Sequence, residues 1–335
     1  MLHRSWLGIV FVLVARDLFV PPQAWGESAV EIGAIKEDKF IWLSLLGPLD
    51  NSSGRSVAGA TDLMLHSTFP VGKAETFAWM PDGDHVLLAR DGGLDMVDLD
   101  GRLVRRVCAG WAWTRSPDVS KDGSWIVFVG YRRGGRPKLW RVQADGSGLT
   151  ELVGGHEPAI AADEKAVYFE QYTDGPRFYR YEFATKKVSE FKPHPKLEFR
   201  PAYDLAIEHD GKWMAFTCDE MSLFQVETGK IWPLSDDRFH DDDVDFASPS
   251  DWLMFRRRTR DPERGPHAER IVVMEMGQLR RYAAGEPICI KRISQGGLSS
   301  ALPRTYLFPA WTIPMDGLEQ ARFRPLTNLK RRPAG

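Results

Sequence analysis

The strongest constraint on the fold is the stretch 116–155, in which short apolar segments alternate with turn-forming residues. Residues 125–129 form an apolar run of strand length, 139–142 alternate apolar and basic side chains, and 149–153 close the unit. The dipeptides Asp122-Gly123 and Asp145-Gly146 favour tight turns between such strands. One small antiparallel unit of this kind cannot bury both faces of its sheet. The pattern therefore predicts further copies along the chain.

Those copies are present. In 74–107, Asp82-Gly83 and Asp100-Gly101 correspond to the two Asp-Gly turns of the first unit. Further copies lie at 158–191, 200–234 and 244–282, a partial copy at 288–328, and three more strands are expected at 29–35, 40–45 and 63–67. The spacing of roughly 37 to 50 residues is typical of β-propeller blades. The sequence predicts an all-β, six- or seven-bladed β-propeller of four-stranded antiparallel blades, with no helix.

Large apolar residues recur at matching positions of these copies. Trp125, Trp213 and Trp252 follow the first turn of their units, and a phenylalanine lies three residues after each, at 128, 216 and 255. We expect this series to pack one sheet against the next. A closed ring of such sheets also leaves no exposed inner edge strands.

Charge and the first residues limit the class of protein. The net charge is -2 at pH 7, which argues against a dedicated nucleic-acid surface. Arg4 precedes an apolar run at 6–15, and a run of about ten residues has signal-peptide length but is too short to span a bilayer. We expect a signal peptide at 1–26, with an uncleaved anchor as the alternative. One propeller domain at 27–330, a tail at 331–335 and a periplasmic or secreted monomer follow as predictions.

The repeat motifs point to a known family. The matching segments are Trp79-Met80-Pro81-Asp82-Gly83, then 121–128 and 144–150, and finally Met315-Asp316-Gly317 with Pro325-Leu326-Thr327. They resemble the repeat of the TolB-type β-propellers, a WD-repeat-like family of bacterial envelope proteins, over roughly 73–328. The resemblance implies the fold and an envelope location. We expect a relative rather than TolB itself, because the α/β domain that precedes the TolB propeller has no counterpart in the residues before the repeats. No G-x-S-x-G motif supports a serine hydrolase.

Candidate binding residues lie in segments that propeller topology gathers on one face. Loops between the second and third strands of each blade share that face with the crossovers between blades. Two such loops are basic and one crossover is acidic; their candidate residues are Arg132, Arg133 and Arg136, then Arg256, Arg257 and Arg258, then Asp241, Asp242 and Asp243. The planar fork of arginine suits bidentate contacts with carboxylates. The face is therefore predicted to bind an envelope protein or glycan, unless these loops only pair with one another.

Histidines supply an alternative. His156, His194 and His240 fall in successive predicted crossovers, where the ring could gather them around one divalent metal. Propeller polysaccharide lyases that resemble oligogalacturonate lyase use a histidine-rich metal site of this kind. The acidic crossover also allows a calcium site. The predicted function is a non-catalytic binding scaffold of the cell envelope, without cofactor. A propeller-type lyase or hydrolase with a metal at the channel mouth remains the alternative.

Overall fold

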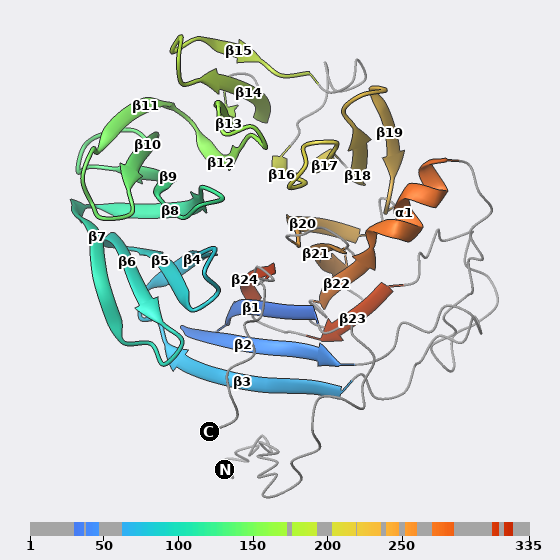
Figure 1. Ribbon diagram of the computed structural model, residues 1–335, viewed down its shortest axis with the longest axis horizontal. Helices are drawn as coiled ribbons and strands as arrows, with labels where there is room; N and C mark the ends of the chain where they lie inside the picture. Colours follow the sequence, from blue (N-terminus) through green and yellow to red (C-terminus); the bar gives the residue numbers. More distant parts are fainter. Residues whose placement is uncertain are drawn as a thin grey trace, which may run out of the picture.

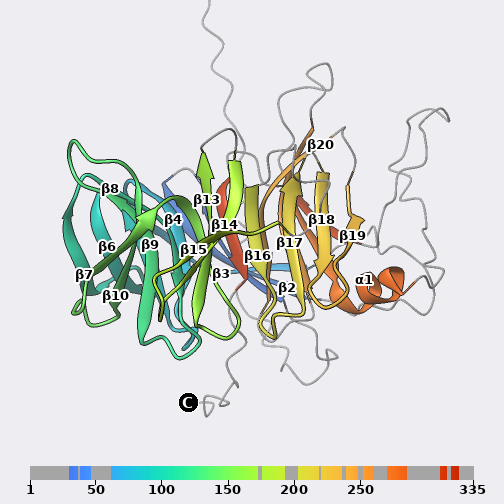
Figure 2. The same ribbon diagram turned by 90° about the horizontal axis from the view of Figure 1, so that it is seen from above.

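The computed structural model describes residues 30–36, 38–46, 62–172, 176–192, 203–218, 220–235, 239–247, 252–259, 270–284, 310–314 and 318–323. These residues form six four-stranded antiparallel sheets arranged as a ring around a central axis (Figure 1). The fold is thus a six-bladed β-propeller. In the perpendicular view the strands run between the two faces of the ring (Figure 2). The predicted signal peptide at 1–26 and tail at 331–335 lie outside the described residues, so the predicted domain boundaries stay a prediction.

Each blade runs from an innermost strand beside the axis to an outermost strand at the rim. In this order, blade 1 contains β24 (Leu318–Phe323), β1 (Val30–Lys36), β2 (Lys39–Leu46) and β3 (Asp62–Pro70). Blade 2 contains β4 (Ala74–Trp79), β5 (His85–Arg90), β6 (Gly92–Asp98) and β7 (Leu103–Trp111). Blade 3 contains β8 (Trp113–Val119), β9 (Trp125–Tyr131), β10 (Lys138–Gln143) and β11 (Thr150–Gly154).

The second half of the ring follows the same order. Blade 4 contains β12 (His156–Ile160), β13 (Ala166–Tyr172), β14 (Pro176–Glu182) and β15 (Val188–Glu190). Blade 5 contains β16 (Tyr203–Ile207), β17 (Trp213–Cys218), β18 (Glu220–Gln225) and β19 (Lys230–Pro233). Blade 6 contains β20 (Phe239–Phe246), β21 (Trp252–Thr259), β22 (Arg270–Glu275) and β23 (Ala310–Pro314).

The ring closes through blade 1, whose strands come from both ends of the described chain. β24 pairs antiparallel with β1, from Ile32 opposite Phe323 to Lys36 opposite Leu318. Inner strands contact one another in a complete circle, from β24 through β4, β8, β12, β16 and β20 back to β24. This closure explains the blade count: the partial copy predicted at 288–328 is divided between blade 6, which receives β23, and blade 1, which receives β24.

The Asp-Gly dipeptides form turns, as the repeat predicted. Asp122 accepts a hydrogen bond from Ser124 N at 2.9 Å, and hydrogen bonds from Ser124 and Ser120 lower the pKa of its carboxyl to about 2. Asp210 accepts one from Lys212 N at 2.9 Å, and Asp145 accepts one from Ser147 N at 2.8 Å. Gly123 adopts φ +73°, a region that glycine enters without steric cost. These aspartates hold turns in place and leave the blades free to pack.

The core lies between neighbouring blades. Phe128, Phe216 and Phe255 are completely buried on the second strands of their blades, as predicted, and Phe169 occupies the corresponding strand of blade 4. Each apolar cluster joins residues of two adjacent blades; Phe169, for example, packs with Trp125 and Leu139 of blade 3. Burial of such large side chains contributes about 1.5–3 kcal/mol each, so the blades stabilise one another.

A short helix corrects the prediction for the end of the copy at 244–282. The sequence predicted only strands and no helix, but α1 (Met276–Ala283) follows β22 directly. Met276 and Leu279 are buried in the cluster shared by blades 5 and 6, and their spacing of three residues places both on one helix face. Arg280 pairs with Glu208, whose side chain is fully buried. Within the described residues no helix is both long and apolar enough to span a membrane.

Candidate functional site

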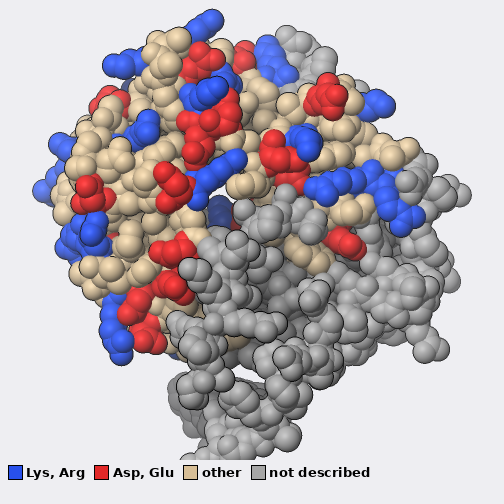
Figure 3. All heavy atoms as spheres, viewed as in Figure 1, with Lys and Arg blue, Asp and Glu red and all other residues tan. Residues whose placement is uncertain are grey.

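Strand connections divide the surface of the ring into two faces. The turns between first and second strands and between third and fourth strands, including the Asp-Gly turns, lie on one face, which we call the turn face. The loops between second and third strands lie on the other, the crossover face, together with the connections between blades. On one face of the molecule acidic residues gather around a hollow at the centre of the ring (Figure 3).

The predicted basic segment 132–136 joins β9 to β10 on the crossover face, and we call it the arginine loop. Arg132, Arg133 and Arg136 are all exposed. Gly135 N donates a hydrogen bond to Arg132 O at 2.7 Å, and Gly134 adopts φ +81°, so a tight turn shapes the loop. The Arg132 guanidinium carbon lies 5.1 Å from the ring centroid of Trp111 and 5.7 Å from that of Trp140.

Within the described residues, no ion pair neutralises the positive charge of the arginine loop. None of its three arginines forms an ion pair within the described part of the chain, whereas most other arginines there do form one. The paired ones are Arg90, Arg102, Arg106, Arg177, Arg180, Arg256, Arg257, Arg258 and Arg280. Exposed arginine forks without a carboxylate are free to bind an anionic group from another molecule.

The second predicted cluster lies in strands, not in a loop and a crossover. Asp241, Asp242 and Asp243 belong to β20, and Arg256, Arg257 and Arg258 belong to β21. The register places Asp241 opposite Arg257 and Asp242 opposite Arg256. The predicted position in a loop and a crossover is therefore wrong, because the acidic run is part of the inner strand of blade 6 and the basic run is part of its second strand. Whether these residues contact a partner stays a prediction.

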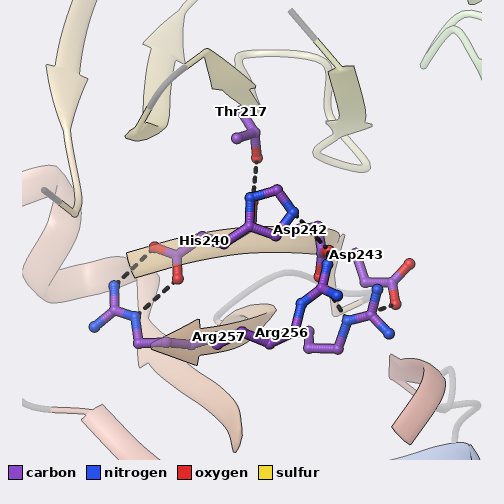
Figure 4. Close-up of polar contacts among 8 residues, drawn as sticks. Thr217, His240, Asp242, Asp243, Arg256 and Arg257 are labelled. Atoms are coloured by element: carbon purple, nitrogen blue, oxygen red, sulfur yellow. Dashed lines mark hydrogen bonds and ion pairs between the residues drawn. The ribbon is translucent and has the colours of Figure 1, made fainter. Parts of the chain in front are cut away.

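Ion pairs across β20 and β21 hold the cluster together (Figure 4). The Arg257 guanidinium donates two parallel hydrogen bonds to the Asp241 carboxylate, from Nε to Oδ1 at 2.8 Å and from Nη2 to Oδ2 at 2.9 Å. The Asp241 side chain is only 1% exposed. On the opposite face of the sheet, Asp242 binds Arg256 Nε at 2.6 Å and also pairs with Arg258. Thr217 Oγ1 of blade 5 donates to Asp241 O at 3.0 Å, so the network also joins two blades.

The structure places only two of the three predicted metal-binding histidines. His156 begins β12, where its ring packs edge-on against Tyr172 with centroids 5.1 Å apart. His240 lies in β20, with Nε2 at 3.4 Å from Asp242 Oδ2. His194 lies outside the described residues. No group of three or more His, Cys, Asp or Glu residues that could hold a metal occurs in the described part of the chain. The metal site stays a prediction.

The structure adds a central cavity that the sequence analysis missed. It has a volume of about 120 Å³ and lies between inner strands β8, β12, β16, β20 and β24. Five carboxylates and one described basic residue line it: Asp118, Glu157, Asp204, Asp243 and Asp245, with Arg322. Arg322 comes from β24, so closure of the ring brings this cation to the acidic residues.

Irregular backbone positions these carboxylates. Ser116, Glu157, Asp204 and Asp243 have φ of 48°, 42°, 55° and 54°, and each lies where the pairing of its inner strand with the second strand shifts register. Such bulges re-aim side chains and are frequent beside functional sites. None of the four is a glycine, and although aspartate adopts positive φ more often than most residues, serine and glutamate do so rarely, so the sequence carries only a weak signal for this conformation.

Hydrogen bonds between adjacent blades fix the lining of the cavity. Ser116 N of blade 3 donates to Thr76 Oγ1 of blade 2 at 2.8 Å, and Ser116 Oγ donates to Glu157 Oε1 of blade 4 at 2.8 Å. Asp204 N of blade 5 donates to Glu170 Oε1 of blade 4 at 2.7 Å. The cavity is therefore a rigid feature of the assembled ring.

Burial and mutual repulsion raise the pKa of several acids that line the cavity or lie beside it. Burial raises the pKa of Asp118 and of Asp243 to about 6. Burial and the neighbouring Glu157 raise the pKa of Glu170 to about 8, and burial with Asp243 and Glu170 nearby raises that of Asp204 well above its usual range. Although burial lowers the pKa of Arg322, Asp245 and Asp243 raise it overall. The raised pKa values reflect the cost of gathering several acids in one buried place, so part of this acidic group is protonated at neutral pH.

Comparison with known proteins agrees with this architecture. A solved structure assigned to TolB from Agrobacterium tumefaciens superposes with a TM-score of 0.55 at 15% identity, covering 75% of this chain and 86% of that one. TolB from Acinetobacter baumannii gives a TM-score of 0.56 at 14% identity, covering 89% of this chain and 66% of that one. This chain has a TolB-like β-propeller fold. At such low identity the likeness concerns the fold alone.

Sequence comparison reaches less far. No family model matches the chain. An uncharacterized protein from Agrobacterium fabrum is 35% identical over 78 residues, which is 22% of this chain and 26% of that protein. The match thus spans about a quarter of the length of this curated relative.

Proposed function

We propose that this protein is an exported, non-catalytic TolB-like propeller that binds a protein or glycan of the cell envelope through its crossover face. The observation that carries the proposal is the arginine loop. Arg132, Arg133 and Arg136 are exposed on that face and have no ion-pair partner among the described residues. Three arginines that lie within five residues of one another and form no ion pair in the described part of the chain make a surface suited to recognition.

The remaining charges of the predicted binding face support a different role. Asp241 and Asp242 are buried, and each is bound by at least one arginine of β21. Breaking such a pair leaves an uncompensated buried charge, which costs about 3–5 kcal/mol. We therefore assign contact with the partner to the arginine loop, and assign support of blade 6 to the aspartate–arginine pairs.

Location and oligomeric state belong to the same proposal. The apolar run at 6–15 after Arg4 supports export to the periplasm or beyond. Closure of the ring through β24 gives the inner strands partners within one chain, which supports a monomer.

Affinity capture from the envelope fraction tests this function. The bait variants are the wild type, a triple variant with Arg132→Glu, Arg133→Glu and Arg136→Glu, and a control with Lys186→Glu, Lys187→Glu and Lys230→Glu. The three control lysines are exposed at the turn face, Lys186 and Lys187 in the turn before β15 and Lys230 at the first residue of β19. Both triple variants change the net charge by the same amount. We expect the wild type and control to retain the same envelope partner, and the arginine variant to lose at least about 90% of it, since each lost charge-assisted contact weakens binding several-fold.

Equal far-ultraviolet circular dichroism and equal urea midpoints of the baits establish that the arginine variant is folded. Unchanged capture by that variant contradicts the proposed binding face. Absence of any specific envelope partner for the wild type contradicts the proposed function.

A further inference from the structure

We infer that the arginine loop binds the carboxylates of a short acidic segment in a partner protein. The inference rests on the proposed function and specifies the chemistry of the partner. Three guanidinium groups lie within the segment 132–136, and no carboxylate within the described part of the chain forms an ion pair with them. A carboxylate can accept two parallel hydrogen bonds from one such fork, with geometry that an ammonium group does not offer.

The loop is also held in a defined shape before any partner arrives. Arg132 lies over both Trp111 and Trp140, and these two rings contact each other edge to face at 4.8 Å. Trp140 is itself fixed, because its Nε1 donates to Gly130 O at 3.2 Å. A guanidinium group anchored in this way loses less conformational freedom when it binds a carboxylate.

Aromatic residues beside the loop favour a polypeptide as the source of the carboxylates. Tyr131 and Trp140 are partly exposed, and Tyr131 packs edge-on against Trp113 with centroids 5.5 Å apart. Arginine, tryptophan and tyrosine together form the typical centre of a protein interface, because they combine anchored apolar area with directional polar contacts. Apolar side chains between the acidic residues of a partner segment would pack on these rings.

The acidic cavity limits how far an anionic partner can extend. Glu157 lines it on the inner strand of blade 4, next to blade 3, which carries the arginine loop, and Asp243 lines it on the inner strand of blade 6. A long polyanion or an anionic membrane surface that covered the crossover face would bring negative charge against these carboxylates. A short acidic segment can bind the loop and avoid them. The arrangement therefore favours a local polypeptide contact over an acidic glycan or a lipid surface.

Fluorescence anisotropy with defined probes tests the inference. The first probe is a short fluorescein-labelled peptide of glutamate, leucine and glycine, and the second carries glutamine in place of every glutamate. We expect the full-length wild type to bind the acidic peptide at least about tenfold more tightly than the amide peptide, and to weaken as salt is added. Tight binding of both peptides, or of neither, overturns the inference.

Variants separate charge from fork geometry. Replacing Arg133 and Arg136 by glutamine is expected to weaken binding of the acidic peptide about twentyfold, and replacing both by lysine about fivefold, because lysine keeps the charge and loses the bidentate contact. A control with Lys186→Gln and Lys187→Gln on the turn face should bind like the wild type. Equal binding by the lysine and wild-type proteins contradicts the fork geometry.

Two further probes identify the class of ligand. Polygalacturonate and phosphatidylglycerol vesicles compete for the same arginines if the loop serves a glycan or a membrane. Stronger binding of either one than of the acidic peptide overturns the inference. The envelope capture decides the proposed function independently: a partner that is captured through the arginines but binds without acidic residues leaves that function standing and removes the inference.

Discussion

Asp241 and Arg257 show that the role of a charged residue depends on the strand that carries it. In the sequence both belong to runs of like charge, which are ordinarily solvated. In the structure they face each other across β20 and β21 and bind through two hydrogen bonds at 2.8 and 2.9 Å. The arginine loop keeps its predicted exposure because a glycine turn, rather than a strand, follows Arg132 and Arg133. Sequence composition alone does not distinguish the two arginine clusters.

The raised pKa of Glu170 predicts that the stability of the fold depends on pH. Its side chain accepts hydrogen bonds from Asp204 N and Tyr172 OH, and its pKa of about 8 lies above its ordinary value of 4.5. A group with a raised folded-state pKa stabilises the fold fully below its unfolded pKa, and this contribution is lost as the pH rises through the folded value. Asp118 and Asp243 act in the same direction at lower pH, with pKa values of about 6.

We therefore expect the free energy of unfolding to fall by about 5 kcal/mol between pH 5.5 and pH 8.5, and by about 2 kcal/mol in a Glu170→Gln variant. Urea denaturation followed by tryptophan fluorescence measures both. Glu151→Gln, at an exposed glutamate of β11, is the control and should keep the wild-type dependence. An equal fall in wild type and the Glu170 variant would rule out this carboxyl as the source.

At the scale of the elements, the sequence predicted the turns between strands correctly. Asp82-Gly83 and Asp122-Gly123 both connect a first strand to a second, as the repeat predicted, and Asp210-Gly211 does the same in blade 5. The helix α1 was missed because its eight residues are too few for a clear period, and its place is decided by burial of Met276 and Leu279. The bulges at Glu157 and Asp204 were missed because glutamate rarely adopts a positive φ, and aspartate does so too seldom for its presence alone to mark a bulge.

Strands β6 and β7 of blade 2 approach each other closely at Gly93. A Cβ atom added at Gly93, which has φ +149°, would lie 2.0 Å from Cys108 O, a backbone atom of the paired strand. At Gly92, with φ +95°, nothing lies within 4 Å of the added atom. We expect Gly93→Ala to destabilise the protein by at least about 3 kcal/mol and Gly92→Ala by about 1 kcal/mol, in chemical denaturation. Similar losses for the two variants would contradict the close packing of this strand pair.

At the scale of the whole molecule, the fold was predictable and the site only in part. Recurring turns and apolar strands imply a ring, and the structure confirms the TolB-like propeller. The number of blades depended on β24, because the last repeat contributes its strands to two different blades. The central cavity arises only on closure, which brings Arg322 to acidic residues that are distant in the sequence. No local motif could have predicted that arrangement.

The most direct test of the crossover face as a binding surface is a hydrogen-exchange footprint of the full-length protein with its captured envelope partner. We predict slower amide exchange at 131–138, in and beside the arginine loop, and unchanged exchange in the turns at 99–102 and 184–187 on the opposite face. Protection confined to those turns, with the arginine loop exchanging as in the free protein, would contradict the crossover face as the binding surface.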